Sequence, residues 1–270
     1  MNLQLVVTTR TLTAKQNNID PAFQNAKAED SALSILLEQD GLSFLVRNKT
    51  TRQLYLSGFI PSKELTSTAI DDLLVSFPVR PKQIIVAVEA PLAVILPAEF
   101  RSDNTEWTTH VLGAQANSIF HSKALSMEVH ALVDPAILAQ LKTVGLEIRH
   151  NWLVQMERIT LSSTPKMWIH LYGSAVLIMA GQGKKWELVN SFPCENKDEL
   201  LYHIGNVSEQ LNWDRKSVHV ELSGLDAAEY LEFISSYFGS VNLFKSKEWG
   251  QKSSAFGPWD ATAFATLLRL

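Results

Sequence analysis

The sequence predicts an α/β protein in which one module, three strands followed by a helix and a further strand, occurs twice. Segments that alternate between apolar and polar residues follow one another in the same order in both halves of the chain. In each half the helix leads to a continuous apolar run, Ile84–Val88 and Val218–Leu222, which is typical of a buried central strand. The 270 residues, 46% of them hydrophobic, provide enough apolar material for two cores.

The first copy follows a polar lead-in that covers residues 1–30. Its pattern predicts strands at residues 33–39, 42–47 and 53–59, a helix at residues 62–77 and a strand at residues 84–88. Between the first two strands, Asp40 and Gly41 predict a tight turn, because both residue types tolerate positive φ. Pro78 and Pro81 end the helix, since proline cannot continue it.

The second copy repeats this order. We expect strands at residues 167–172, 175–180 and 186–192, a helix at 195–211, a strand at 218–222, a helix at 225–238 and a strand at 241–244. Gly173 stands in the first turn of this copy, and the pattern aligns it with Gly41. The polar residues 162–165 predict the hinge between two domains, at 31–162 and 163–270.

The first copy contains additional sequence between residues 91 and 164. It predicts an inserted subdomain near residues 92–132, with a helix at 107–120 and a strand at 127–133. A helix at 135–144 that ends at Gly145, a strand at 146–150 and a linking helix at 153–161 follow. After the aromatic-rich stretch 249–259, the apolar residues 261–270 predict a terminal helix that packs on its own domain.

Charge and composition exclude several classes of protein. The net charge is −4 and no basic run occurs, so nucleic acid is not an expected partner. A single cysteine, Cys194, forms no internal disulfide, and residues 1–10 lack the pattern of a secretion signal. The most apolar stretch, residues 84–100, is interrupted by Glu89, Pro91 and Pro97, which is unlike a membrane span. These features predict a cytoplasmic protein.

Short motifs then suggest a family. Residues 88–92 (VEAPL) resemble the segment that follows the equivalent strand in actin, and residues 133–138 and 144–148 resemble PilM-type pilus-assembly proteins. Residues 33–44 and 190–224 are similar to an uncharacterised bacterial family that is assigned the same fold. Three antiparallel strands followed by a crossover helix and a strand form the ribonuclease H-like order. The chain thus resembles the actin-like ATPase superfamily over most of residues 31–245, which implies duplicated ribonuclease H-like domains, each a mixed five-stranded sheet with helices.

The resemblance implies a site for ATP with magnesium between the two copies. In such a site, turns after the strands cradle phosphate, and an aspartate positions the metal. The matching residues are Asp40, Gly41 and Ser43 in the first phosphate turn, with Asp40 at the metal, Gly173 and Ser174 in the second, Ser223 and Gly224 in the adenosine turn, and Glu89 where related enzymes orient the attacking water. The same residues are also typical of an ordinary hairpin turn and of a solvated strand end.

Two departures from the family pattern decide between the functions that the resemblance implies. The second phosphate turn, Tyr172-Gly173-Ser174, lacks the aspartate, and the adenosine turn has one glycine where two are usual. Loss of a metal-positioning carboxylate weakens catalysis, because preorganised charge contributes strongly to rate. We therefore expect a scaffold that binds a protein partner, as PilM-type proteins bind short peptides of membrane proteins. The alternative is an active ATPase that uses Asp40 and Glu89.

Other chemistries find less support. The chain has no phosphate-binding loop with the Gly-x-x-x-x-Gly-Lys pattern, no dinucleotide fingerprint, no nucleophile elbow and no His-Glu-x-x-His zinc pair. Cys194 has no evident neighbouring base. A ribonuclease H-like nuclease would place Glu38, Asp40 and Glu89 around two metal ions. The duplicated architecture and the acidic balance argue against that reading.

Overall fold

The computed structural model describes residues 19–38, 41–65, 68–90, 92–100, 105–135, 138, 146–224, 226–245 and 261–270. The chain divides into two compact units. The first unit comprises residues 1–156, 247–259 and 266–270, and the second comprises residues 157–246 and 260–265. The domain limits at 31–162 and 163–270 stay a prediction.

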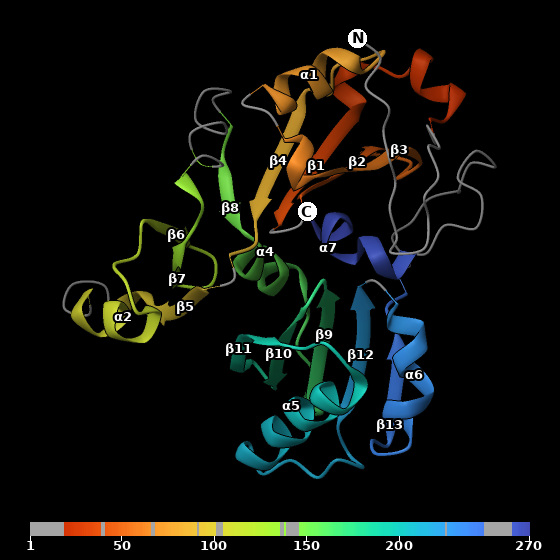
Figure 1. Ribbon diagram of the computed structural model, residues 1–270. Helices are drawn as coiled ribbons and strands as arrows, with labels where there is room; N and C mark the ends of the chain where they lie inside the picture. Colours follow the sequence, from red (N-terminus) through yellow and green to blue (C-terminus); the bar gives the residue numbers. More distant parts are fainter. Residues whose placement is uncertain are drawn as a thin grey trace. The chain divides into compact units, whose positions relative to one another are not determined.

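A mixed five-stranded sheet forms the centre of the first unit (Figure 1). Its strands are β1 (Ser31–Glu38), β2 (Gly41–Asn48), β3 (Leu54–Pro61), β4 (Gln83–Val88) and β8 (Ile148–His150), in the order β3-β2-β1-β4-β8. The first three strands are antiparallel, whereas β1, β4 and β8 are parallel. Helix α1 (Ala69–Ser76) connects β3 to β4, and helix α4 (Asn151–Arg158) follows β8 directly.

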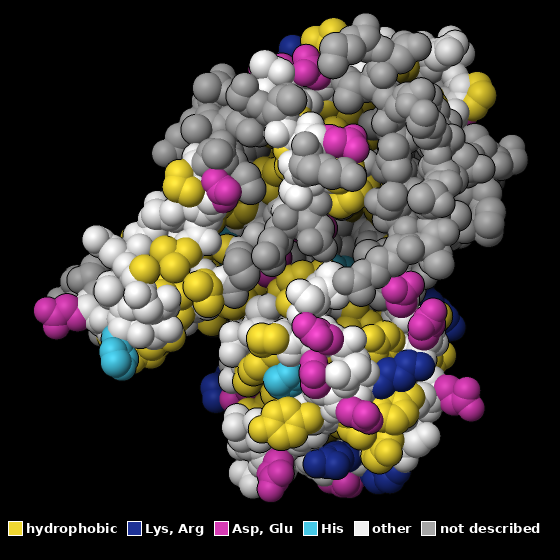
Figure 2. Space-filling model, in the orientation of Figure 1, with side chains coloured by type: hydrophobic (Ala, Val, Ile, Leu, Met, Phe, Trp, Pro, Cys, Tyr) yellow, Lys and Arg dark blue, Asp and Glu magenta, His cyan; other side chains and the backbone are white. Residues whose placement is uncertain are grey.

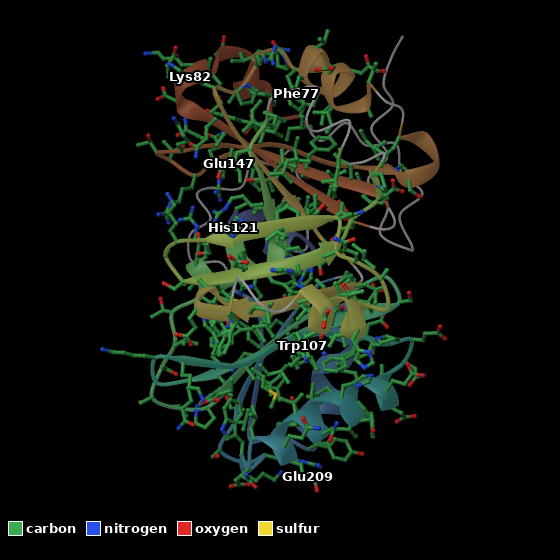
Figure 3. All side chains as sticks on the ribbon, turned by 90° about the vertical axis from the view of Figure 1, so that its left-hand side faces the viewer. Phe77, Lys82, Trp107, His121, Glu147 and Glu209 are labelled. Atoms are coloured by element: carbon green, nitrogen blue, oxygen red, sulfur yellow. The ribbon has the colours of Figure 1, made fainter. Side chains whose placement is uncertain are left out.

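Aromatic rings fill the core beside this sheet. The ring centroid of Phe44 in β2 lies 6.2 Å from that of Phe77, which follows α1. Phe77 is labelled in Figure 3. Phe23 of the short 3-10 helix Pro21–Asn25 is fully buried and stacks on Tyr55 at 5.2 Å. Gly58 faces the Phe44 ring, where an added Cβ would lie 2.3 Å from Cζ. The lead-in segment thus supplies a core residue to the first unit.

The inserted subdomain is a three-stranded antiparallel sheet with one helix. Its elements are β5 (Leu92–Pro97), α2 (Thr105–Leu112), β6 (Ser118–Ser122) and β7 (Met127–Leu132), and the strand order is β5-β7-β6. The predicted helix at residues 107–120 is wrong, because α2 ends at Leu112 and the chain re-enters as strand β6. Gly113 follows α2 with φ +72°, a backbone conformation that commonly ends helices.

The second unit repeats the sheet of the first. Its strands are β9 (Lys166–Tyr172), β10 (Ala175–Gln182), β11 (Lys185–Pro193), β12 (His219–Gly224) and β13 (Ser240–Leu243), in the order β11-β10-β9-β12-β13. Helix α5 (Lys197–Gln210) leads from β11 to β12, and α6 (Ala227–Ser235) leads from β12 to β13. The core of this unit contains Ile169, Ile178, Leu200 and Ile204. The predicted fold class is therefore confirmed.

Short helices complete the described part of the chain. They are the 3-10 helices Ala28–Asp30, Ser62–Glu64, Ala98–Phe100 and Ala261–Phe264 and the α-helix α7 (Ala265–Arg269). No helix among the described residues is long and apolar enough to cross a membrane.

The hairpin registers correct one detail of the comparison between the two copies. Glu38 pairs with Gly41 across the β1–β2 hairpin, and Tyr172 pairs with Ala175 across the β9–β10 hairpin. Gly41 is therefore equivalent to Ala175, and the sequence alignment that matched it with Gly173 was wrong by two residues. By the same count Ser174 occupies the position of Asp40, so the second copy still has no carboxylate there.

Candidate functional site

The residues predicted in the first copy gather where β1 and β4 end. Glu89 follows β4, and its backbone N–H donates to the Leu37 carbonyl at 2.8 Å, across the parallel pair. Gly41 begins β2 opposite Glu38, and the Ser43 hydroxyl lies 3.5 Å from the Glu38 carboxylate. These side chains therefore share one edge of the first sheet. Asp40, the predicted metal ligand, lies outside the described residues.

The Glu89 carboxylate is buried, with 9% of the residue exposed. Asn151 donates from Nδ2 to Oε2 at 2.6 Å, and Trp152 donates from Nε1 to Oε1 at 2.9 Å. Both donors belong to the first turn of α4. The expectation of a solvated strand end is therefore wrong, because helix α4 covers the carboxylate. Asn151 and Trp152 were not predicted from the sequence as site residues. The one signal that could have pointed to them is that strand β8 leads directly into helix α4, which places both residues in the first turn of that helix.

A chain of polar side chains extends from Asn151 through the first unit. Gln155 Nε2 donates to Asn151 Oδ1 at 3.3 Å and to Thr266 Oγ1 at 2.8 Å. Arg269 Nη1 in turn donates to Gln155 Oε1 at 2.7 Å. Asn151 and Gln155 are fully shielded from solvent, so each hydrogen bond replaces one that water would otherwise make. Glu89 is thus tied to α4 and, through Gln155, to the C-terminal residues.

His150 connects β8 to α4. Its Nδ1 accepts the Trp152 backbone N–H at 3.2 Å, which caps the start of the helix. The centroid of the ring lies 5.5 Å from that of Phe120 and 5.2 Å from that of Trp152, and Nε2 has no hydrogen-bond partner among the described residues. Burial disfavours the charged imidazolium and lowers the pKa of His150 from 6.5 to about 3. His150 is therefore neutral at physiological pH.

The second copy presents its predicted phosphate turn at the end of β9. Gly173 and Ser174 are exposed, and Gly173 adopts φ +54°, in the left-handed region that favours glycine. The Ser174 carbonyl accepts the Cys194 backbone N–H at 2.8 Å. Beside the turn, the Tyr172 hydroxyl hydrogen-bonds to the Ser191 hydroxyl. The backbone of this turn is exposed to solvent, but the turn contains no carboxylate side chain.

At the predicted adenosine turn, which follows β12, two polar groups are hydrogen-bonded to other residues of the protein. The buried Ser223 hydroxyl donates to the Ile169 carbonyl at 3.1 Å and accepts from His170 Nδ1 at 3.0 Å. The Gly224 carbonyl accepts from Thr262 Oγ1 at 3.2 Å. Gly224 has φ +102°, and a Cβ there would lie 2.0 Å from the Leu171 carbonyl oxygen, so only glycine fits. The Ser223 hydroxyl and the Gly224 carbonyl therefore face the protein.

Two further observations concern ligands. Among the described residues no group of three His, Cys, Asp or Glu side chains is arranged to hold a metal ion. A cavity of about 270 Å³ lies at the opposite edge of the second sheet, where β9 and β12 begin. An ion pair of 3.0 Å between Lys166 and Glu221 lines it. The cavity is therefore separate from the turns at the strand ends.

Comparison with solved structures defines the class of protein by its fold, which is an actin-like ATPase fold. A protein of Bacteroides thetaiotaomicron with actin-like ATPase fold and unknown function matches with a TM-score of 0.68 at 16% identity, covering 92% of this chain and 98% of that one. A chain of the PilM–PilN type IV pilus biogenesis complex matches with a TM-score of 0.58 at 10% identity, covering 88% and 97%.

The family follows from the sequence profile. The chain belongs to the family described as "Protein of unknown function (DUF3822)", whose profile matches residues 20–241. The resemblance to an uncharacterised family with an actin-like ATPase fold is thereby confirmed. No curated protein sequence matches the chain.

Proposed function

We propose that this protein is a cytoplasmic, non-catalytic scaffold that uses an actin-like ATPase fold to bind a protein partner. Nucleotide is at most a bound ligand in this proposal and is not hydrolysed. The observation that carries the proposal is the state of the adenosine turn, where Ser223 and the Gly224 carbonyl are hydrogen-bonded to His170, Ile169 and Thr262. A nucleotide that used these two groups as hydrogen-bond partners would have to displace their present contacts, each of which contributes to stability.

The first copy supports the same proposal. A residue that orients an attacking water needs a carboxylate oxygen that is accessible to that water. Asn151 and Trp152 each donate to one oxygen of Glu89. In the second copy Ser174 stands at the position of Asp40, so one of the two carboxylates that position magnesium is replaced by a hydroxyl. The described residues thus fit a catalytic magnesium site poorly.

A protein partner is supported by the inserted subdomain. Trp107 and Val111, one turn apart on α2, are each about half exposed, as are Leu92 and Ile119 of the neighbouring strands. Figure 2 shows apolar side chains on the surface of the inserted subdomain, and Figure 3 labels Trp107 on α2. Exposed apolar groups of this kind commonly mark interaction sites. Because one relative forms the PilM–PilN complex, we propose a peptide segment of a membrane protein as the partner.

Isothermal titration calorimetry with Mg-ATP separates the scaffold from its alternative, an active ATPase that uses Asp40 and Glu89. We expect no magnesium-dependent binding at millimolar ATP, and no ATP turnover. Tight binding that requires magnesium and is abolished by Asp40→Ala would contradict the proposal. Weak binding without turnover that survives Asp40→Ala is consistent with a scaffold that holds nucleotide passively.

A second experiment tests the partner surface. The double variant Trp107→Ser, Val111→Ser should reduce the amount of a cross-linked partner recovered with the protein, because it removes the exposed apolar groups of α2. Tyr202→Ser is the matched control, since Tyr202 of α5 is also exposed. Equal recovery with both variants would rule out the α2 surface as the contact.

A further inference from the structure

The polar network around Glu89 has a direction. A carboxylate lies at one end and the Arg269 guanidinium at the other, and the side-chain amides of Asn151 and Gln155 lie between them. Each amide donates toward Glu89 and accepts from the side of Arg269. The two amide dipoles therefore point the same way and strengthen each other, as hydrogen-bonded chains do in a medium of low dielectric constant.

The orientation of both amides is fixed by this arrangement. If Asn151 were turned by 180°, its Nδ2 would meet Gln155 Nε2, and its Oδ1 would meet the Glu89 carboxylate. If Gln155 were turned, its Nε2 would meet the Arg269 guanidinium. Each alternative places donor against donor or acceptor against acceptor, inside a region without water to compensate. The amide of Gln155 thus depends, through Asn151, on the Oε2 acceptor of Glu89.

The C-terminal residues Thr266–Leu270 depend on Gln155 in turn. Thr266, Leu267 and Leu270 are almost completely buried. Gln155 contacts this segment twice, through the Thr266 hydroxyl and the Arg269 guanidinium, and Arg47 Nη1 donates to the Leu268 carbonyl at 2.8 Å. All of these residues belong to the first unit. Only five residues of α-helix are involved, so the helix has little stability of its own and needs these contacts.

We propose that Glu89, Asn151 and Gln155 form a latch that holds the C-terminal segment Thr266–Leu270 on the first unit. In this latch the segment responds to the hydrogen-bonding state of Glu89 through the side-chain amides of Asn151 and Gln155. A cation or a donor group that takes the Glu89 oxygens from Asn151 and Trp152 weakens the latch and loosens the segment. By thermodynamic linkage, release of the segment also makes Glu89 more available. The coupling holds whether or not the protein binds nucleotide.

Hydrogen–deuterium exchange of the full chain tests the latch from the Glu89 end. In Glu89→Gln the Asn151 amide meets either an NH2 group or an uncharged carbonyl oxygen, and both are poorer acceptors than the carboxylate oxygen that it has in the wild type. We expect the backbone amides of residues 266–270 to exchange at least about fivefold faster than in the wild type. Glu221→Gln, a glutamate of the second unit that pairs with Lys166, should leave their exchange unchanged. Faster exchange in α4 alone, with residues 266–270 unchanged, would overturn the proposal.

The reverse direction keeps the proposal testable if Glu89→Gln fails to fold. Thr266→Val preserves shape and removes one contact of Gln155. The readout is the indole N–H resonance of Trp152, assigned from its loss in Trp152→Phe, because this proton reports on the Glu89 carboxylate. We expect a shift of the resonance in Thr266→Val and none in Thr262→Val, where the hydroxyl contacts Gly224 in the second unit. An unchanged Trp152 resonance in a folded Thr266→Val protein refutes the latch.

Discussion

Substitution of His150 by phenylalanine should make the protein less sensitive to acid. In the folded state burial lowers the pKa of this imidazole to about 3, whereas in the unfolded chain it has the ordinary value of 6.5. Between these two values the unfolded chain binds one proton more than the folded protein does. Stability is therefore fully present above pH 6.5 and falls as the pH decreases toward 3, which is the sign expected for a histidine that is buried in its neutral form.

The size of the effect follows from the difference between the two pKa values. Each pH unit between them costs about 1.4 kcal/mol of the free energy of unfolding. From about pH 6 to about pH 4, His150 should therefore remove roughly 2–3 kcal/mol. Protonation would also end the acceptor role of Nδ1 toward the Trp152 N–H, so the start of α4 should respond first. This loss is a sizeable share of the stability of an ordinary domain.

Urea unfolding at a series of pH values, for wild type and for His150→Phe, measures this contribution. The substitution also changes packing and removes a helix cap, but these changes shift the free energy of unfolding by a nearly constant amount at every pH. The quantity to follow is the free energy of unfolding of the wild type minus that of His150→Phe. This difference should fall by roughly 2–3 kcal/mol from about pH 6 to about pH 4. A difference that is independent of pH would show that His150 does not remain neutral in the folded state.

Further predictions concern the turns and the Glu89 contacts. Gly224→Ala should cost more than about 3 kcal/mol in chemical unfolding, because its Cβ would meet the Leu171 carbonyl at a positive φ. Gly183→Ala, at φ +65° with open space around it, should cost only about 1 kcal/mol, and equal losses would contradict the steric argument. Trp152→Phe leaves the buried Glu89 with one donor fewer and should cost about 1–3 kcal/mol, whereas an unchanged midpoint would show that this bond adds little.

The candidate site shows where reasoning from sequence reaches its limit. The segments that end at the site were predictable, because apolar runs and turn residues mark strand ends locally. The burial of Glu89 was not, since its two donors come from residues 62 and 63 positions further along the chain. The alignment of the two copies from the sequence was also wrong, because Gly173 in a turn and Gly41 at the start of a strand cannot be told apart by residue type.

By itself, the sequence determined the order of elements that the two sheets share, the fold class and the lack of an aspartate in the second phosphate turn, but not the strands of the inserted subdomain. These features depend on residue type and periodicity over a few positions, which the chain carries locally. The tertiary structure alone decided that Glu89 faces α4, that Ser223 and Gly224 face their own neighbours, and that the C-terminal residues pack on the first unit. Each of these outcomes depends on a hydrogen-bond partner that is distant in sequence, and only the packing of the folded chain brings the partners together.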